Sequence, residues 1–286
     1  MSRLFEALQQ SGGITASAEA PDALDVLDRI HGSMALEDAR PVAVPRTPDR
    51  RLVALEQAPM LGTEKFRQLA TRLKYAQDRT GIKKLLMTSC MRGEGKSMVS
   101  ANLAISLAAN NQNVLLLDGD LRQPRLQYLF DVHQSEGIAE WCTRGDSPMR
   151  YLRRVEDLPL WILPAGQNAP NGAGALKPQK VTELLSELQT SFEWVLIDAP
   201  PVLAFADSLM WAAACDRVLM VVREGQTSKK MLAKAIEAIE KPKLLGAVLN
   251  DTSEPEEKYY DRYYTTSASS NGASSNGTAK QAAAAD

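Results

Sequence analysis

The sequence predicts an α/β fold in which a mostly parallel sheet carries helices on both faces. Between residues 84 and 249, short apolar runs alternate with segments of helical periodicity. Each apolar run is continuously hydrophobic, as in strands that are buried on both sides of a parallel sheet. The chain has 286 residues, which is enough for one or two domains with a substantial core.

The first half of this pattern begins with a helix at residues 63–79, where Thr63 suits the N-cap and apolar residues recur every three or four positions. A strand at 84–88 runs into a glycine-rich turn, and a helix at 97–110 follows the turn. The next apolar run predicts a strand at 114–117.

The second half repeats the alternation. Short runs rich in Val, Leu, Ile and Trp predict strands at residues 161–163, 194–197, 217–222 and 244–249. Between these strands, apolar positions at helical spacing predict helices at residues 181–189 and 227–241.

The flanks of the chain have a different composition. Residues 1–60 are expected to be a largely disordered N-terminal arm and linker, with at most a short helix at 2–10 and another near 23–36. Residues 61–252 form the predicted folded domain. Residues 253–286 hold a tyrosine cluster and then a polar tail without large apolar residues, which predicts disorder.

Composition excludes several functional classes. Lys and Arg number 33 against 35 Asp and Glu, so the charge balance does not suit a protein that mainly coats nucleic acid. Three cysteines without a CxxC pair and two histidines argue against a disulfide framework or a zinc site. No apolar segment suits a signal peptide or a membrane span, so we expect a cytoplasmic protein without direct membrane insertion.

The glycine-rich turn has the features of a phosphate-binding loop between a strand and a helix. Gly93 and Gly95 let backbone N–H groups turn inward around phosphate oxygens, and the helix N-terminus adds positive potential. Lys96 is placed to reach β- and γ-phosphates, and the Ser97 hydroxyl to bind Mg²⁺. Cys90 stands where the usual pattern has its first glycine. The turn therefore predicts a P-loop NTPase fold that binds ATP and Mg²⁺.

Acidic residues follow two of the predicted strands. Asp118 and Asp120 come after one apolar run, and Asp198 ends another. Because the carboxyl ends of neighbouring parallel strands meet at the ligand crevice, these carboxylates are expected near Ser97. They could hold Mg²⁺, which prefers oxygen ligands. Arg122 is either a partner of Asp118 and Asp120 or a phosphate contact.

Three segments together resemble a known family. The segments GEGKS, LLLDGDLRQP and VLIDAPPVL resemble the Walker A, Walker A′ and Walker B motifs of the bacterial tyrosine kinases of capsule and exopolysaccharide export. The resemblance covers about residues 63–264. It implies a separate cytoplasmic kinase that forms homo-oligomers and is recruited to the inner face of the membrane by the tail of a polysaccharide co-polymerase. A cognate tyrosine phosphatase is also implied.

The resemblance assigns roles to individual residues. Lys96, Asp118 and Asp120 match the catalytic positions. The expected nucleotide-binding residues are Gly93, Glu94, Gly95, Lys96, Ser97 and Met98 in and after the loop, together with Asn250, which follows the last predicted strand, where bases tend to lie in this fold. The expected metal ligands are Ser97, Asp120 and Asp198. Asn250 is either an adenine contact or a cap of the last strand. Glu64 and Arg67 match the family's oligomerisation motif, whereas Ala70 replaces its last arginine and Arg92 replaces the proline that usually precedes GEGKS.

The tyrosine cluster is the expected phosphoacceptor. It comprises Tyr259, Tyr260, Tyr263 and Tyr264. A tyrosine hydroxyl has a pKa near ~10 and needs a base. Asp118 is the candidate base with Asp120 as a metal ligand, or the two roles are exchanged. Several added phosphates would make the tail strongly anionic, so we expect transfer between subunits and weaker assembly afterwards.

Two other functions remain open from the sequence. A P-loop ATPase switch of the septum-positioning or partition type shares the fold, but such proteins carry a lysine near the start of the loop, where this chain has Met91. A non-catalytic, nucleotide-sensing regulator of a polysaccharide co-polymerase is the other alternative.

Overall fold

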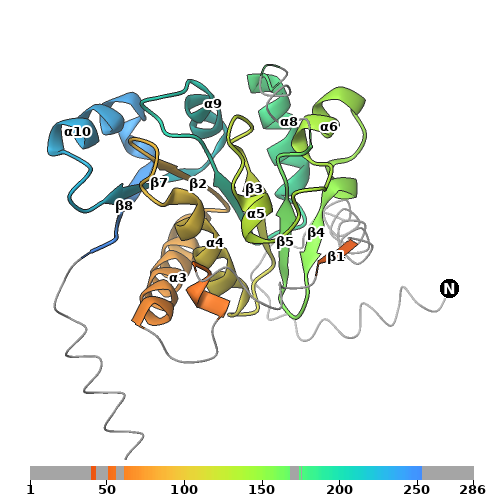
Figure 1. Cartoon of the computed structure of the whole chain (residues 1–286), viewed down its shortest axis with the longest axis horizontal. Coiled ribbons are helices and arrows are strands. Elements are labelled where there is room, and N and C mark those ends of the chain that lie inside the picture. Colours follow the sequence, from red (N-terminus) through yellow and green to blue (C-terminus); the bar gives the residue numbers. More distant parts are fainter. Residues whose placement is uncertain (1–39, 43–50, 56–60, 168–173, 175, 253–286) are drawn as a thin grey trace, which may run out of the picture.

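The sheet of the computed structural model has eight strands and lies at the centre of the molecule (Figure 1). The structure describes residues 40–42, 51–55, 61–167, 174 and 176–252. The strands in chain order are β1 (Arg40–Val42), β2 (Lys84–Ser89), β3 (Val114–Asp118), β4 (Arg153–Val155), β5 (Leu160–Leu163), β6 (Trp194–Asp198), β7 (Arg217–Arg223) and β8 (Leu244–Asn250). Their spatial order is β1-β4-β5-β3-β6-β2-β7-β8.

All neighbouring strands pair in parallel except β4 and β5, which pair antiparallel. The α-helices of the described part are α3 (Leu61–Thr80), α4 (Lys96–Ala108), α5 (Leu126–Leu129), α6 (Ile138–Arg144), α8 (Pro178–Leu188), α9 (Asp207–Ala214) and α10 (Lys229–Ala238). Short 3₁₀ turns lie at Val53–Leu55, Pro148–Tyr151 and Lys241–Lys243.

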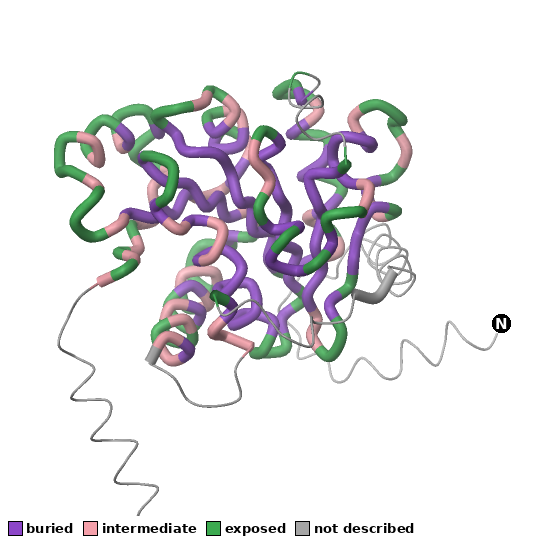
Figure 2. Tube along the Cα trace, in the orientation of Figure 1, coloured by how far each residue is buried: buried purple, intermediate pink, exposed green. Residues whose placement is uncertain are grey.

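Two apolar layers enclose the sheet, and they explain why its central strands β3 and β6 are hydrophobic on both faces. In β3, Leu116 packs with α3, α4 and α5 on one face, whereas Leu115 and Leu117 pack with α6, α8 and α9 on the other. The central strands are accordingly buried throughout (Figure 2). The predicted α/β fold with a mostly parallel sheet and helices on both faces is confirmed.

The structure adds elements that the sequence analysis missed. The helices α6 and α9 have only seven and eight residues, and β1 and β4 have three each, too few for a clear periodicity. Part of the predicted linker is ordered, because β1 pairs with β4 and Leu52 is only 1% exposed. The helices predicted at 2–10 and 23–36 lie outside the described residues, and the domain boundaries stay predictions.

None of the helices in the described part of the chain has the length and apolar character that a membrane crossing needs.

Position 137 requires glycine because the backbone there lies very close to the backbone of Pro164, which follows β5. A Cβ at this position would lie 2.0 Å from the carbonyl oxygen of Pro164 and 2.6 Å from its carbonyl carbon. Backbone atoms cannot rotate away, so Gly137→Ala is expected to lower the free energy of unfolding by about 3 kcal/mol. Urea unfolding measures the effect. Gly174→Ala, where a Cβ meets nothing within 4 Å, is the control and should change stability by less than about 0.5 kcal/mol.

Candidate active site

The phosphate-binding loop joins β2 to α4 and depends on two glycines with positive φ. Gly93 has φ of 87° and Gly95, the N-cap of α4, has φ of 86°. L-residues with side chains rarely adopt these values. A Cβ on Gly95 would also lie 2.2 Å from Nδ2 of Asn250. The backbone conformation therefore requires glycine at position 95, and a side chain there would also displace the amide of Asn250 at the end of β8.

The buried carboxylate of Glu94 stabilises the phosphate-binding loop through hydrogen bonds. Its side chain is 2% exposed, and Oε2 accepts a hydrogen bond of 2.8 Å from the N–H of Met91. Thr227 donates a hydrogen bond from Oγ1 to Oε1 of Glu94, and Asn250 donates from Nδ2 to the Glu94 carbonyl at 3.0 Å. Arg223 donates to the Gly93 carbonyl at 3.2 Å. The sequence analysis missed the roles of Thr227 and Arg223, which join the loop only through the tertiary fold.

Lys96 lies at the centre of a buried charge cluster. Its Nζ is 3.2 Å from Oδ2 of Asp120 and 3.5 Å from Oδ2 of Asp198, and it donates to Oγ of Ser97 at 3.4 Å. Burial alone would lower the pKa of Lys96, but the charges of Asp198, Asp120 and Asp118 raise it above its usual value. The ammonium is therefore firmly protonated at neutral pH.

The two strand-end aspartates that are fully buried have raised pKa values. Burial raises the pKa of Asp198, and Lys96 only partly offsets this effect. Burial and the charge of Asp198 raise the pKa of Asp118 well above its usual range. Oδ2 of Asp198 is buried and accepts no hydrogen bond from the described residues, although it forms an ion pair with the Lys96 ammonium at 3.5 Å. Such an oxygen, next to the Ser97 hydroxyl, suits the oxygen-rich shell of Mg²⁺.

Asp118 and Asp120 have different positions although they are two residues apart. Asp118 does not line the cavity, and its oxygens accept from the backbone N–H groups of Asp120 at 3.3 Å and of Arg125 and Leu126 at 3.1 Å each. Asp120 lines the cavity beside Lys96. Asp120 therefore faces the cavity and Asp118 does not, and the assignment of the base and the metal ligand between them stays a prediction.

Arg122 has a main partner that the sequence analysis did not consider. Its Nε donates to Oδ2 of Asp207 at 2.7 Å, and its guanidinium lies 5.3 Å from the centre of the Phe205 ring. Arg122 does not line the cavity. Its main partner is therefore the carboxylate of Asp207 at the start of α9, which no local pattern indicates, and Asp120 adds a weaker electrostatic attraction. The phosphate contact stays a prediction.

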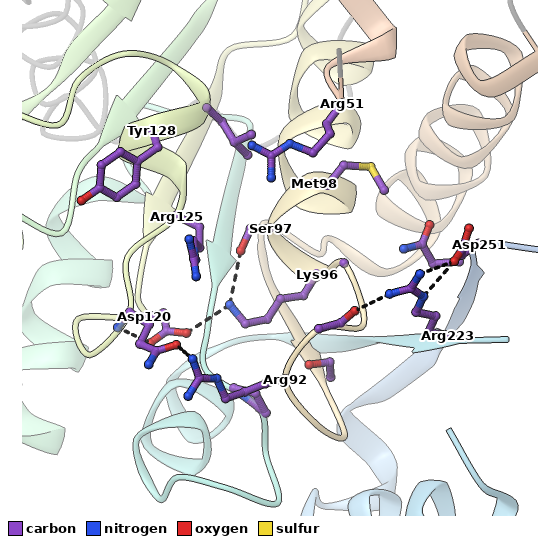
Figure 3. A pocket seen from close by; sticks show the side chains of 17 residues that line it. Arg51, Arg92, Lys96, Ser97, Met98, Asp120, Arg125, Tyr128, Arg223 and Asp251 are labelled. Atoms are coloured by element: carbon purple, nitrogen blue, oxygen red, sulfur yellow. Dashed lines mark hydrogen bonds and ion pairs between the residues drawn. The ribbon is translucent and has the colours of Figure 1, made fainter. Parts of the chain in front are cut away.

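A cavity of about 740 Å³ opens over the loop and α4 (Figure 3). Its lining combines loop backbone with cationic side chains, which suits a polyanionic ligand. The residues that line it are Arg51, Ser89, Arg92, Gly93, Gly95, Lys96, Ser97, Met98, Asp120, Gln123, Arg125, Tyr128, Leu129, Pro201, Arg223, Asn250 and Asp251.

The remaining candidate residues lie elsewhere. Arg67 forms an ion pair of 3.7 Å with Glu64 on the outer side of α3. Ala70, at the last position of the expected oligomerisation motif, is fully buried in the core. The tyrosines expected to accept phosphate, Tyr259, Tyr260, Tyr263 and Tyr264, lie outside the described residues. Nowhere in the described part of the chain do three or more His, Cys, Asp or Glu side chains gather to hold a metal ion by themselves.

Comparison with known proteins agrees with this geometry. Residues 82–252 match the family model described as Cellulose biosynthesis protein BcsQ. Tyrosine-protein kinase YwqD of Bacillus subtilis is 32% identical over 76% of this chain and 92% of its own length. The kinase domain of Escherichia coli tyrosine kinase ETK superposes with a TM-score of 0.66 at 25% identity, covering 74% of this chain and 91% of that domain.

A third similar structure is the chimerical protein CapA2B2, with a TM-score of 0.66, 27% identity, and coverage of 79% of this chain and 100% of the chimera. The match to the BcsQ model spans more than half of the chain, and YwqD is matched over nearly its full length. The resemblance carried by the three motifs is therefore confirmed. This chain belongs to the P-loop family that the BcsQ model describes and, by its curated relatives, to the bacterial tyrosine kinases.

Proposed function

We propose that this protein transfers the γ-phosphoryl group of ATP to the tyrosines of its own C-terminal cluster, between subunits, and so regulates capsule or exopolysaccharide polymerisation and export. The observation that carries the proposal is Lys96, which is held between Asp120 and Asp198 in a phosphate-binding loop. The two carboxylates hold the ammonium in place before nucleotide binds, so little rearrangement is needed to meet the phosphates.

The loop and its neighbours would hold the nucleotide. Backbone N–H groups from Gly93 to Met98 surround the phosphates, and Lys96 neutralises charge on the transferring group. Asn250, at the end of β8, is proposed for the adenine end of the cavity. Ser97 and Asp198 would hold Mg²⁺, which neutralises phosphate charge when it is bound.

Asp120 is the proposed base for the acceptor hydroxyl. Its carboxylate lines the cavity and lies 3.2 Å from Nζ of Lys96. Asp118 is proposed as a positioning residue instead, because its oxygens accept backbone N–H groups on both sides of the loop that carries Asp120. The acceptor proton would move to Asp120 while the phosphoryl group moves to the phenolic oxygen.

The proposed partners follow from the family. They are the cytoplasmic tail of a membrane polysaccharide co-polymerase, which would recruit the protein to the inner face of the membrane, further copies of the chain, and a cognate tyrosine phosphatase. Each added phosphate carries about −1.5 to −2 charges, so a phosphorylated cluster would repel a neighbouring one. Phosphorylation is thus proposed to weaken assembly and to act as the regulatory signal.

Incubation with ATP and Mg²⁺, with and without candidate co-polymerase tails, followed by intact mass and site mapping, tests the proposal. Phosphate is expected on the cluster of Tyr259, Tyr260, Tyr263 and Tyr264. Replacing all four with phenylalanine should remove it while nucleotide affinity stays unchanged. ATP hydrolysis without phosphotyrosine would support the ATPase switch instead, and nucleotide binding without either reaction would support the sensing regulator.

A further inference from the structure

The phosphate-binding loop carries a second cation, Arg92, that the mechanism described so far does not use. Arg92 is exposed and lines the active-site cavity together with Lys96 and Asp120. Figure 3 shows its side chain beside Asp120, on the side of Lys96 that faces away from Arg223 and Asp251. Arg92 and Lys96 therefore offer positive charge to the same end of the cavity.

The backbone on both sides of Arg92 is held by hydrogen bonds. On one side, the N–H of Met91 donates to Oε2 of Glu94 at 2.8 Å. On the other side, Arg223 donates to the Gly93 carbonyl at 3.2 Å. The point at which the Arg92 side chain leaves the loop is therefore fixed before any ligand binds, and a contact from this position costs little reorganisation.

A neutral side chain orients the guanidinium of Arg92. Its Nη2 donates to Oε1 of Gln123, which also lines the cavity. Gln123 is held in turn by Asp120, because the backbone N–H of Gln123 donates to Oδ1 of Asp120 at 3.1 Å. An amide carries no charge, so Gln123 positions Arg92 without neutralising it.

The charge of Arg92 is available to a ligand, in contrast to that of two other cations in the cavity. Lys96 is shared between Asp120 at 3.2 Å and Asp198 at 3.5 Å, and Nε of Arg223 donates to a carboxylate oxygen at 2.8 Å. Within the described part of the chain, Arg92 forms no ion pair. A guanidinium without a carboxylate partner, next to a phosphate-binding loop, suits paired hydrogen bonds to phosphoryl oxygens.

We propose that Arg92 is a catalytic residue that binds the transferring phosphoryl group of ATP in the transition state, and that Gln123 is its positioning residue. This inference rests on the proposed function. In phosphoryl transfer, negative charge spreads over the equatorial oxygens of the group in flight. The ammonium of Lys96 is shared with two carboxylates and leaves part of this charge to be stabilised by a second cation.

The bonds that change are those of the proposed reaction. The phenolic oxygen of the acceptor tyrosine forms a bond to the γ-phosphorus, and the bond from that phosphorus to the β–γ bridging oxygen breaks. ADP leaves with the electron pair of the broken bond, and the phenolic proton moves to Asp120. Arg92 forms hydrogen bonds to the phosphoryl oxygens during this step and exchanges no proton, because a guanidinium stays protonated in proteins.

Single-turnover transfer from labelled ATP gives the first test. Arg92→Ala is expected to lower the transfer rate about a hundredfold, while the dissociation constant of ATP changes less than about threefold. Arg92→Lys keeps the charge but not the paired hydrogen bonds, so it should recover about tenfold of the loss. Arg150→Ala is the control, because Arg150 is 71% exposed and does not line the cavity.

A double-mutant cycle tests the role of Gln123. Gln123→Ala is expected to lower the transfer rate about tenfold in the native background and to have no further effect in Arg92→Ala. A merely structural role of Gln123 would lower the rate equally in both backgrounds, which would overturn its assignment as the positioning residue.

The affinity for ADP with Mg²⁺ and aluminium fluoride gives a readout that needs no acceptor tyrosine, because this complex mimics the phosphoryl group in flight. Arg92→Ala should bind it about a hundredfold more weakly than the native protein, with unchanged affinity for ADP alone. An equal loss for ADP alone would mean that Arg92 holds nucleotide in the ground state. Slower transfer with unchanged affinity for the aluminium fluoride complex would mean that Arg92 acts on the acceptor instead. Either result would overturn the inference.

Failure of the inference and failure of the proposed function give different results. If the native chain forms phosphotyrosine and Arg92→Ala transfers within about threefold of the native rate, the role of Arg92 is refuted and the proposed function stands. If the native chain forms no phosphotyrosine and binds ADP with aluminium fluoride no more tightly than ADP alone, the proposed function is refuted, and the role of Arg92 with it.

Discussion

Replacing Lys96 with methionine is expected to lower the rate of phosphoryl transfer about a thousandfold. Methionine has a similar length but no charge, so negative charge on the transferring group loses its cationic partner. Single-turnover transfer from labelled ATP measures the effect. Lys230→Met, at an exposed position on α10, is the control and should transfer at the native rate. A Lys96→Met protein with more than about a tenth of the native rate would contradict the mechanism.

The same substitution has a predictable effect on stability. It leaves Asp118, Asp120 and Asp198 without their ammonium partner, and removing one member of a buried charge group costs about 3 kcal/mol. Because the folded pKa of Lys96 lies above its unfolded value, this stabilisation is fully present below pH ~10.4. It declines as the pH rises through the folded pKa. Urea unfolding of the native and Lys96→Met proteins between pH 8 and 11 measures this effect. The difference between their free energies of unfolding should become smaller as the pH rises.

The positions of the site residues that the sequence predicted follow from local rules. A buried strand, a turn with two glycines and a helix place Lys96 and Ser97 at the ligand edge whatever packs around them. The acids after β3 and β6 reach the same edge because these strands are parallel neighbours, and Asp118 pairs in register with Asp198. The three sequence motifs therefore predict that these side chains meet. They do not predict which of Asp118 and Asp120 faces the cavity.

Contacts that arise only from packing could not be predicted in this way. Arg122 pairs with Asp207 across 85 positions, and Glu94 meets Thr227 across 133. No periodicity or spacing connects such residues in the sequence. Arg51 is a similar case, since the Pro-rich and Arg-rich composition around it indicates a linker, and only the fit of Leu52 into the core against α4 brings it to the cavity.

Asp198→Asn is expected to lower the transfer rate about a hundredfold or more and, unusually for a buried substitution, to stabilise the fold. The rate falls because the proposed magnesium site loses a charged oxygen. Stability rises because three carboxylates share one ammonium, and Asp120 remains 3.2 Å from Lys96 after the change. The asparagine carbonyl oxygen can still accept from Ser100, which now donates to Oδ1 of Asp198 at 3.3 Å.

The pH dependence gives this prediction a distinctive signature. The folded pKa of Asp198 is raised by burial, so the native state holds a proton that the unfolded chain, with a pKa near ~3.9, has already released. The native protein therefore loses stability as the pH rises from about 4 through the folded pKa, and the variant lacks this loss. We expect the variant to be more stable by about 1–2 kcal/mol at pH 8, with the difference shrinking towards pH 4. Asp131→Asn, on an exposed carboxylate, should show neither effect, and a variant that is less stable than the native protein at pH 8 would refute the argument.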